Sequence, residues 1–183
     1  MVFPLFRQRK LEHSTSSYAA LLIDMQERFL KRYTVNNLEP IISAQTAVLR
    51  FCGSHDIPLV VIEYYGCGST AFSLREVIAD IPRTLTVEKS VPDAFAFTSL
   101  DEQLRRWNVT DLLVMGIYAS ACVQDTSKKA LQKGYHLHTA RDCIADAFTL
   151  CGEGKTSFDW YKEHVNLYKT NKKLLESVAS SLG

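Results

Sequence analysis

One stretch of the chain combines a buried strand, a glycine and a cysteine in a way that could support nucleophilic chemistry. The apolar run 112–117 has the length of a strand covered on both faces. Cys122 follows it at the predicted start of a helix, which Gly134 ends. A thiol at a helix N-terminus faces unpaired N–H groups and the positive end of the helix dipole, and both favour the thiolate. The stretch predicts a nucleophilic cysteine, with a buried and inert cysteine as the alternative.

Two charged residues stand where other predicted strands end. Asp24 closes the apolar run 18–23, and Lys89 closes the alternating segment 83–89. In open parallel sheets ligands bind beyond the carboxyl ends of the strands, so both side chains could meet Cys122 at one rim. Asp24 would accept the thiol proton, Lys89 would balance the carboxylate, and the thiol would attack a planar carbonyl carbon. Taken singly, a strand-end cap and a solvated lysine are the alternatives.

The elements that must position these residues alternate along the chain. Alternation of strands and helices predicts right-handed crossovers and a Rossmann-like α/β fold, a three-layer sandwich with a mainly parallel six-stranded sheet. The predicted strands cover residues 18–23, 59–62, 83–89, 111–117, 135–139 and 164–168. The predicted helices run from a cap at Asn36 or Asn37 to about Cys52 with Gly53 as the stop, within 72–81, over 99–107, from Cys122 to about 133, and over 171–182.

Composition limits the domain count, the compartment and the partners. A chain of 183 residues with 46% hydrophobic content predicts one domain, residues 18–183, preceded by a loosely held arm, residues 1–17. The 21 basic and 20 acidic side chains nearly cancel and form no basic stripe, so no nucleic-acid partner is expected. Five scattered cysteines, the absence of a secretory signal pattern and the lack of a membrane-length apolar run predict a cytoplasmic protein without a membrane partner.

Three segments together carry a family resemblance. The segments 24–29 (DMQERF), 89–95 (KSVPDAF) and 116–123 (GIYASACV) look like the signature regions of the isochorismatase-like cysteine hydrolases, a superfamily that includes nicotinamidase, carbamoylsarcosine amidase and isochorismatase. The resemblance implies the triad Asp24, Lys89 and Cys122. It also implies a cis peptide bond between Ile117 and Tyr118, and an oxyanion hole formed by the N–H groups of Tyr118 and Cys122. Members are commonly homo-oligomers, so a dimer or tetramer is expected.

Departures from the family pattern refine the expected chemistry. Nicotinamidases resemble one another in a histidine-rich metal cluster after the second strand, where this chain has residues 63–68 (EYYGCG), so neither a metal nor another cofactor is expected. Isochorismatases usually lack the cysteine, and Cys122 therefore favours carbonyl chemistry. We predict a metal-independent hydrolase that cleaves a small amide or related C–N bond through a covalent thioester. An enol-ether hydrolase of the isochorismatase type and a non-enzymatic binding module are the alternatives. The residues expected to contact the small-molecule substrate are Gln26, Phe29, Tyr64, Phe95 and Tyr118.

Three further patterns carry less weight. Gly154-Lys155-Thr156 resembles the end of a phosphate-binding loop, but the upstream glycine is missing. His136 and His138 share one face of a predicted strand, but no third metal ligand is apparent. Cys67 lies between two glycines and could be an exposed second thiol, although an ordinary loop residue is the simpler interpretation.

Overall fold

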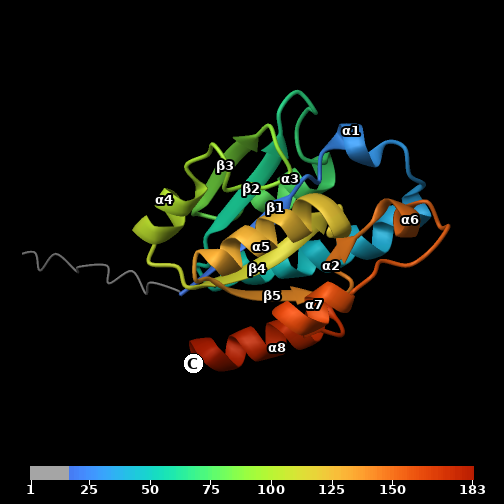
Figure 1. Ribbon diagram of the computed structural model, residues 1–183. Coiled ribbons are helices and arrows are strands. Elements are labelled where there is room, and N and C mark those ends of the chain that lie inside the picture. The colour runs from blue at the N-terminus through green and yellow to red at the C-terminus, as the bar shows by residue number, and fades with distance from the viewer. Residues whose placement is uncertain (1–16) are drawn as a thin grey trace, which may run out of the picture.

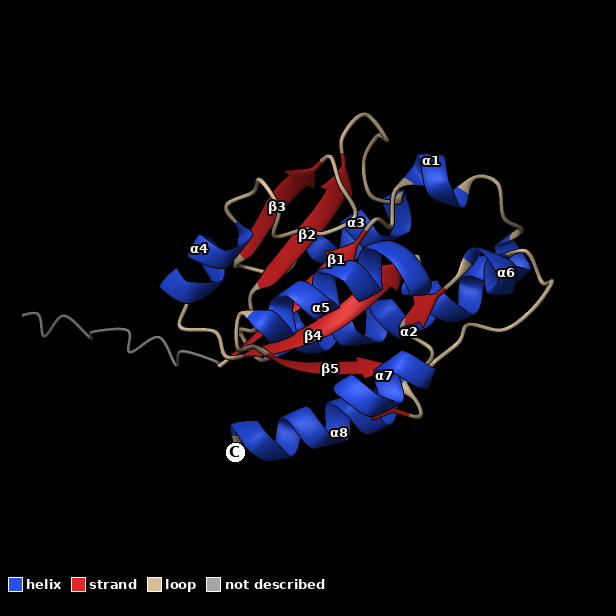
Figure 2. Ribbon diagram, in the orientation of Figure 1, coloured by secondary structure: helices blue, strands red, loops and turns tan. Residues whose placement is uncertain are grey.

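A computed structural model describes residues 17–183 and shows a twisted parallel sheet with helices on both faces (Figures 1 and 2). The strand order is β3-β2-β1-β4-β5-β7, and a short strand, β6, also pairs with β4. All strand pairs are parallel. The strands are β1 (Tyr18–Ile23), β2 (Leu59–Tyr64), β3 (Thr84–Lys89), β4 (Asp111–Ile117), β5 (His136–Ala140), β6 (Ile144–Ala145) and β7 (Asn166–Tyr168).

The helices form two layers because side chains alternate between the two faces of each strand. Residues Ala20 and Leu22 of β1 pack in one core with the α2, α3 and α8 helices, whereas Leu21 and Ile23 pack in the other core with α4, α5 and α7. None of the helices within residues 17–183 is long and apolar enough to cross a membrane. The helices are α1 (Glu27–Leu30), α2 (Val35–Ser54), α3 (Phe72–Ile78), α4 (Leu100–Arg106), the π-helical turn η1 (Ala119–Val123), α5 (Gln124–Gln132), α6 (Ala147–Leu150), α7 (Asp159–His164) and α8 (Asn171–Leu182).

The predicted three-layer fold with a mainly parallel sheet is confirmed, with differences at element ends. β6 is an additional strand of two residues, too short to give a periodic pattern. α2 begins at Val35 after Thr34, not at Asn36 or Asn37, and continues through Gly53 to Ser54. His164 was predicted to begin the sixth strand but ends α7. The predicted arm lies outside the described residues except for Ser17, whose carbonyl accepts the N–H groups of Thr110 and Asp111.

Candidate active site

A glycine allows the two central strands to approach closely at the carboxyl edge of the sheet. Gly116 pairs with Ile23 and has a φ of 140°, which side-chain-bearing residues rarely adopt. A Cβ atom at this position would lie 2.2 Å from the carbonyl oxygen of Ile23. The residues after β1 and β4 therefore emerge side by side, which places Asp24 next to the segment that carries Cys122.

Asp24 leaves β1 through a turn that buries its carboxylate. Its backbone has a φ of 56°, in the left-handed region that aspartate tolerates better than most residues, and its N–H donates to the carbonyl of Ile62 at 2.9 Å. The side chain is 1% exposed. Within the described residues, neither carboxylate oxygen accepts a well-aligned hydrogen bond. The close polar neighbours of this carboxylate are the Lys89 ammonium and the Cys122 thiol, and both act to lower its pKa.

Lys89 reaches Asp24 from two strands away. Neighbouring strands lie about 4.8 Å apart, so a side chain at the end of β3 must extend past the end of β2 to reach β1. The Lys89 ammonium Nζ lies 2.9 Å from Asp24 Oδ2, donates to the Pro92 carbonyl at 3.0 Å, and sits 5.0 Å from the centroid of the Tyr64 ring. The ammonium is fully buried. Burial of a lysine at this position is tolerable because each of these partners favours the cation.

The turn that carries the cysteine differs from the predicted helix start. We call residues 118–123 the nucleophile turn. It contains the π-helical turn η1, in which the N–H groups of Ala121 and Val123 both donate to the Tyr118 carbonyl at 3.1 Å. The Ile117–Tyr118 peptide bond is cis, as the resemblance implied. This turn runs directly into α5, so Cys122 lies in the first turn of one helical segment and is not its first residue. The stabilisation of a thiolate by this helix terminus stays a prediction.

The charge state of the site follows from burial. Burial raises the pKa of Asp24, although the charge of Lys89 and contact with the Cys122 thiol oppose this shift. Burial and the adjacent Asp24 charge raise the pKa of Cys122 to about 11, against the opposing charge of Lys89. At neutral pH the Cys122 thiol is therefore protonated, and in this form it contacts the Asp24 carboxylate. A carboxylate with a raised pKa beside a thiol is a candidate general base.

Sequence reasoning missed the residues that hold the nucleophile turn from behind. Asp146, which is buried, accepts the Ser120 N–H at 2.7 Å and the Ser120 hydroxyl at 2.8 Å. The Tyr161 hydroxyl donates to the Ala119 carbonyl at 2.5 Å. Asp146 follows β6 directly, and Tyr161 belongs to α7. No local pattern marked them, because their contacts with the turn span 26 and 42 positions of the chain.

Three of the five expected substrate-contacting residues form one aromatic group at the rim. The Phe29 ring packs edge-on against the rings of Tyr64 and Tyr118, with centroid distances of 6.5 and 6.0 Å. The Tyr64 hydroxyl donates to the Ser90 carbonyl, and the Tyr118 hydroxyl accepts from Tyr33. Both hydroxyls are thus engaged at the edge of the group. A ligand at this wall would therefore contact the aromatic rings and not the hydroxyl groups. All three residues are partly exposed.

The other two expected residues have different roles in the structure. The side-chain amide of Gln26 is buried and bonds the backbone on both sides of the 64–68 loop, accepting from Tyr64 N at 2.7 Å and donating to the carbonyls of Tyr64 and Gly68. Gln26 therefore fixes this loop, and the amide groups that could have bound a substrate are used for these hydrogen bonds. The Phe95 ring stacks on Tyr135, which precedes the amino end of β5, so it packs in the core and points away from the rim.

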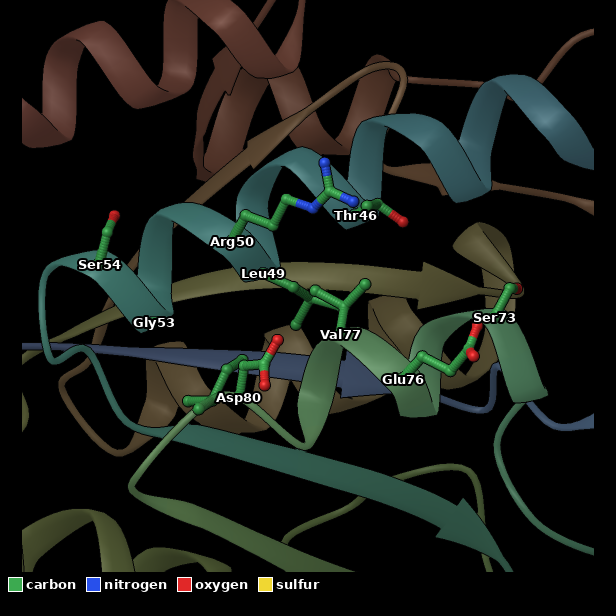
Figure 3. A pocket seen from close by; sticks show the side chains of 10 residues that line it. Thr46, Leu49, Arg50, Gly53, Ser54, Ser73, Glu76, Val77 and Asp80 are labelled. Atoms are coloured by element: carbon green, nitrogen blue, oxygen red, sulfur yellow. The ribbon is translucent and has the colours of Figure 1, made fainter.

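A cavity of about 610 Å³ lies away from the triad, between α2 and α3, where Arg50 points toward Thr46, and Glu76 and Asp80 lie on the opposite side (Figure 3). No group of three or more His, Cys, Asp or Glu side chains within residues 17–183 is arranged to hold a metal ion. His138 is buried against Asp111, whereas His136 is exposed. Cys67 is partly exposed. A metal-independent reaction remains a prediction, and so does the oxyanion hole at Tyr118 and Cys122.

Comparisons with known proteins cover most of the chain. Residues 18–153 match the family model of the isochorismatase domain. The chain is 25% identical over 142 residues to the secreted isochorismatase effector Isc1 of Verticillium dahliae, covering 73% of this chain and 75% of that protein. It is 23% identical over 161 residues to nicotinamidase 3 of Arabidopsis thaliana, covering 76% and 79%. The MAR1 ribonuclease structure from Caenorhabditis elegans has a TM-score of 0.74, with 20% identity and coverage of 89% and 81%, and shares the fold.

Proposed function

Because the chain belongs to the isochorismatase family of hydrolases, we propose that it cleaves a small amide or a related C–N bond through a thioester on Cys122. The observation that carries this proposal is the buried Asp24 carboxylate, which contacts both the Lys89 ammonium and the Cys122 thiol. The similarity to a nicotinamidase supports amide chemistry. The aromatic wall of Phe29, Tyr64 and Tyr118 suits a planar acyl group.

The proposed first half-reaction forms the thioester. Asp24 takes the thiol proton while the sulfur of Cys122 attacks the carbonyl carbon, and Lys89 keeps the local charge balanced. Backbone N–H groups of Tyr118 and Cys122 would receive the developing oxyanion, each contributing about 3–4 kcal/mol to its stabilisation. Asp24 then returns the proton to the nitrogen, the C–N bond breaks, and the amine leaves.

The second half-reaction restores the thiol. Asp24 takes a proton from water as the water oxygen attacks the thioester carbonyl, the C–S bond breaks, and the proton returns to the sulfur. The products are a carboxylic acid and an amine or ammonia. The raised pKa of Asp24 serves both halves, because a more basic carboxylate transfers protons more readily at neutral pH.

Turnover and adduct formation on one set of substrates test this proposal. We would assay amine release from small amides and ureides and cleavage of isochorismate, and measure the intact mass of the protein during turnover of the slowest substrate. One acyl adduct on the Cys122 peptide is expected. Cys122→Ala should abolish adduct and turnover, whereas the control Cys151→Ala, at an exposed position, should retain both.

Two outcomes would favour the alternatives. Near-normal turnover of isochorismate by Cys122→Ala, combined with loss in Asp24→Asn, would support enol-ether hydrolysis in which the cysteine is incidental. Absence of turnover on the whole panel, together with a Cys122 that resists stoichiometric labelling by a mild thiol reagent, would support a binding module.

We further propose a cytoplasmic dimer or tetramer. All five cysteines are free thiols, which suits a reducing compartment. The similar Verticillium protein is named as secreted, so the compartment is best tested directly by cell fractionation. Light scattering coupled to size-exclusion chromatography should give a mass of two or four times 20.7 kDa.

A further inference from the structure

A second cavity, of about 390 Å³, lies beside β6 and is separate from the triad. It is lined by the start of α2, by residues 141–145, which include β6, and by the segment from α6 to Phe158, and we call it the β6 cavity. Its inner wall includes Ile41, Ile144 and Leu150, which are at most 5% exposed. Its volume lies within the range of small-molecule sites, about 300–1,000 Å³. An apolar body of a few carbon atoms fits such a wall.

The opening of the β6 cavity carries positive charge. Arg141 and Lys155 line it and are exposed, and neither forms an ion pair closer than 4.0 Å within residues 17–183. The carboxylate of Asp159, which does not line the cavity, interacts with Arg141 at longer range. The Arg141 guanidinium lies 5.0 Å from the centroid of the Phe158 ring, which also lines the cavity and orients the cation there.

The one carboxylate in the wall of the β6 cavity is already occupied. The backbone N–H of Asn171 lies 2.7 and 3.0 Å from the two oxygens of Asp142, and the Asn171 side-chain amide donates to Oδ2 at 3.0 Å. This carboxylate therefore serves the start of α8. The charge at the opening favours an anion, and the apolar inner wall favours an anion attached to a hydrocarbon body over an inorganic ion.

The β6 cavity also touches the network that holds the nucleophile turn. Thr156 lines the cavity, and its hydroxyl oxygen accepts the N–H of Asp146 at 3.0 Å. The carboxylate of Asp146 in turn holds Ser120 by two hydrogen bonds. An occupant thus contacts a residue that is bonded directly to the support of the turn.

We propose that the β6 cavity is an effector site for a small organic monocarboxylate. The carboxylate binds Arg141 and Lys155, the hydrocarbon body packs on Ile41, Ile144 and Leu150, and occupancy changes the reactivity of Cys122 through Thr156, Asp146 and Ser120. This site is independent of the proposed amide chemistry, because its ligand contacts none of the triad residues.

Binding of 3-phenylpropionate to the full chain, with neutral 3-phenylpropanol as the matched probe, tests the site by titration calorimetry. We expect saturable binding of the acid only, weakened at least tenfold by Arg141→Gln and by Lys155→Gln. Lys172→Gln, which removes the same charge from an exposed lysine outside the cavity, should bind like the unaltered chain. Alkylation of Cys122 beforehand should not prevent binding. No saturable binding, binding that both cavity variants retain, or binding that alkylated Cys122 blocks would overturn the site.

The effector role is tested on the same proteins by the rate at which iodoacetamide alkylates Cys122, followed by peptide mass mapping so that other cysteines are counted separately. Saturating 3-phenylpropionate should change this rate at least twofold in the unaltered chain and not in Arg141→Gln. An unchanged rate at proven saturation would overturn the effector role.

Discussion

The sheet carries a close contact between an acid and a basic group at each end, buried at the carboxyl end and partly exposed at the amino end, and the two contacts have opposite electrostatic outcomes. At the carboxyl end Lys89 Nζ lies 2.9 Å from Asp24, and at the amino end His138 Nε2 lies 2.9 Å from Asp111. Burial would raise the pKa of both carboxyl groups. At Asp111, hydrogen bonds from Thr110 and His138 outweigh burial, and the pKa is lowered. At Asp24 burial prevails, and the pKa is raised.

The comparison shows that the depth of burial, and not the distance to a single basic group, decides the pKa of a carboxyl group, because the side chain of Asp24 is 1% exposed and that of Asp111 is 17% exposed. Asp111 has its oxygens engaged by Thr110 at 2.7 Å and by His138, so its ionised form is fixed in place. Asp24 has the Lys89 ammonium and the Cys122 thiol beside it, but the cost of its burial outweighs both. The first carboxylate acts as a structural anchor, and the second remains able to accept a proton.

Matched asparagine variants give the largest expected difference between the two ends. Asp24→Asn removes the proposed base and should lower kcat/KM by about 10²–10⁴-fold, the usual contribution of general acid–base catalysis. Asp111→Asn should change kcat/KM by less than about threefold, because Asp111 lies at the opposite edge of the sheet. Circular dichroism of both variants provides the control for folding. Equal losses in the two variants would remove the distinction between base and anchor.

The pH dependence of Cys122 alkylation sharpens the assignment of Asp24 as a base. With the pKa of Cys122 raised to about 11, its rate of reaction with iodoacetamide should still be rising steeply at about pH 10, where that of an ordinary thiol with a pKa of 9.0 approaches its limit. Near pH 7 the thiolate fraction should be about 100-fold below that of an ordinary thiol with a pKa of 9.0. The acid limb of kcat/KM should lie above the ordinary carboxyl value of 3.8, because only ionised Asp24 can accept the proton. If the alkylation rate of Cys122 instead levels off below pH 9, the thiol is already ionised near neutral pH and needs no base.

A third carboxylate tests whether anchors near the site act through geometry alone. Asp146 resembles Asp111 in having aligned donors, from Ser120, but it supports the nucleophile turn. Asp146→Ala should lower kcat by about tenfold through misplacement of the turn, with a smaller change in KM. Ser120→Ala keeps the backbone bond to Asp146 and should lose less. A change confined to KM would mean that Asp146 supports substrate binding and not the position of the thiol.

The sequence predicted the triad positions because each residue ends a strand or follows one closely. Hydrophobic runs located those strands, and parallel topology then placed Asp24, Lys89 and Cys122 at one rim. It also predicted Gly134 as a helix stop, which the positive φ of 90° confirms.

The failures have a common physical cause, because they depend on contacts distant in sequence. The π-helical geometry around Cys122 was not predicted, and the hydrogen bonds from Ser120 and Tyr161 that brace this turn join it to segments that local patterning does not connect. The burial that raises the Cys122 pKa likewise depends on the whole rim. Phe95 was misplaced because an aromatic residue after a strand can pack down toward the amino edge as readily as face the rim.

The smallest expected effect is on the free energy of unfolding. Its dependence on pH has opposite signs for Asp111 at the amino end of the sheet and Asp24 at the carboxyl end. The pKa of Asp111 is lowered in the folded chain, so its ionised form contributes stability above the unfolded carboxyl pKa, and this contribution is lost as the pH falls through the folded value. Asp111→Asn should therefore unfold more easily than the unaltered chain at pH 7 by about 1–2 kcal/mol, the scale of one or two weakened hydrogen bonds to a charged group. Urea unfolding at decreasing pH should show this difference shrinking.

The raised pKa of Asp24 has the opposite effect on stability. Ionisation of Asp24 as the pH rises toward neutral costs stability in the folded chain. A difference for Asp111→Asn that persists undiminished at the lowest pH at which both chains fold would show that this carboxylate stabilises the amino edge by its shape and not by its charge.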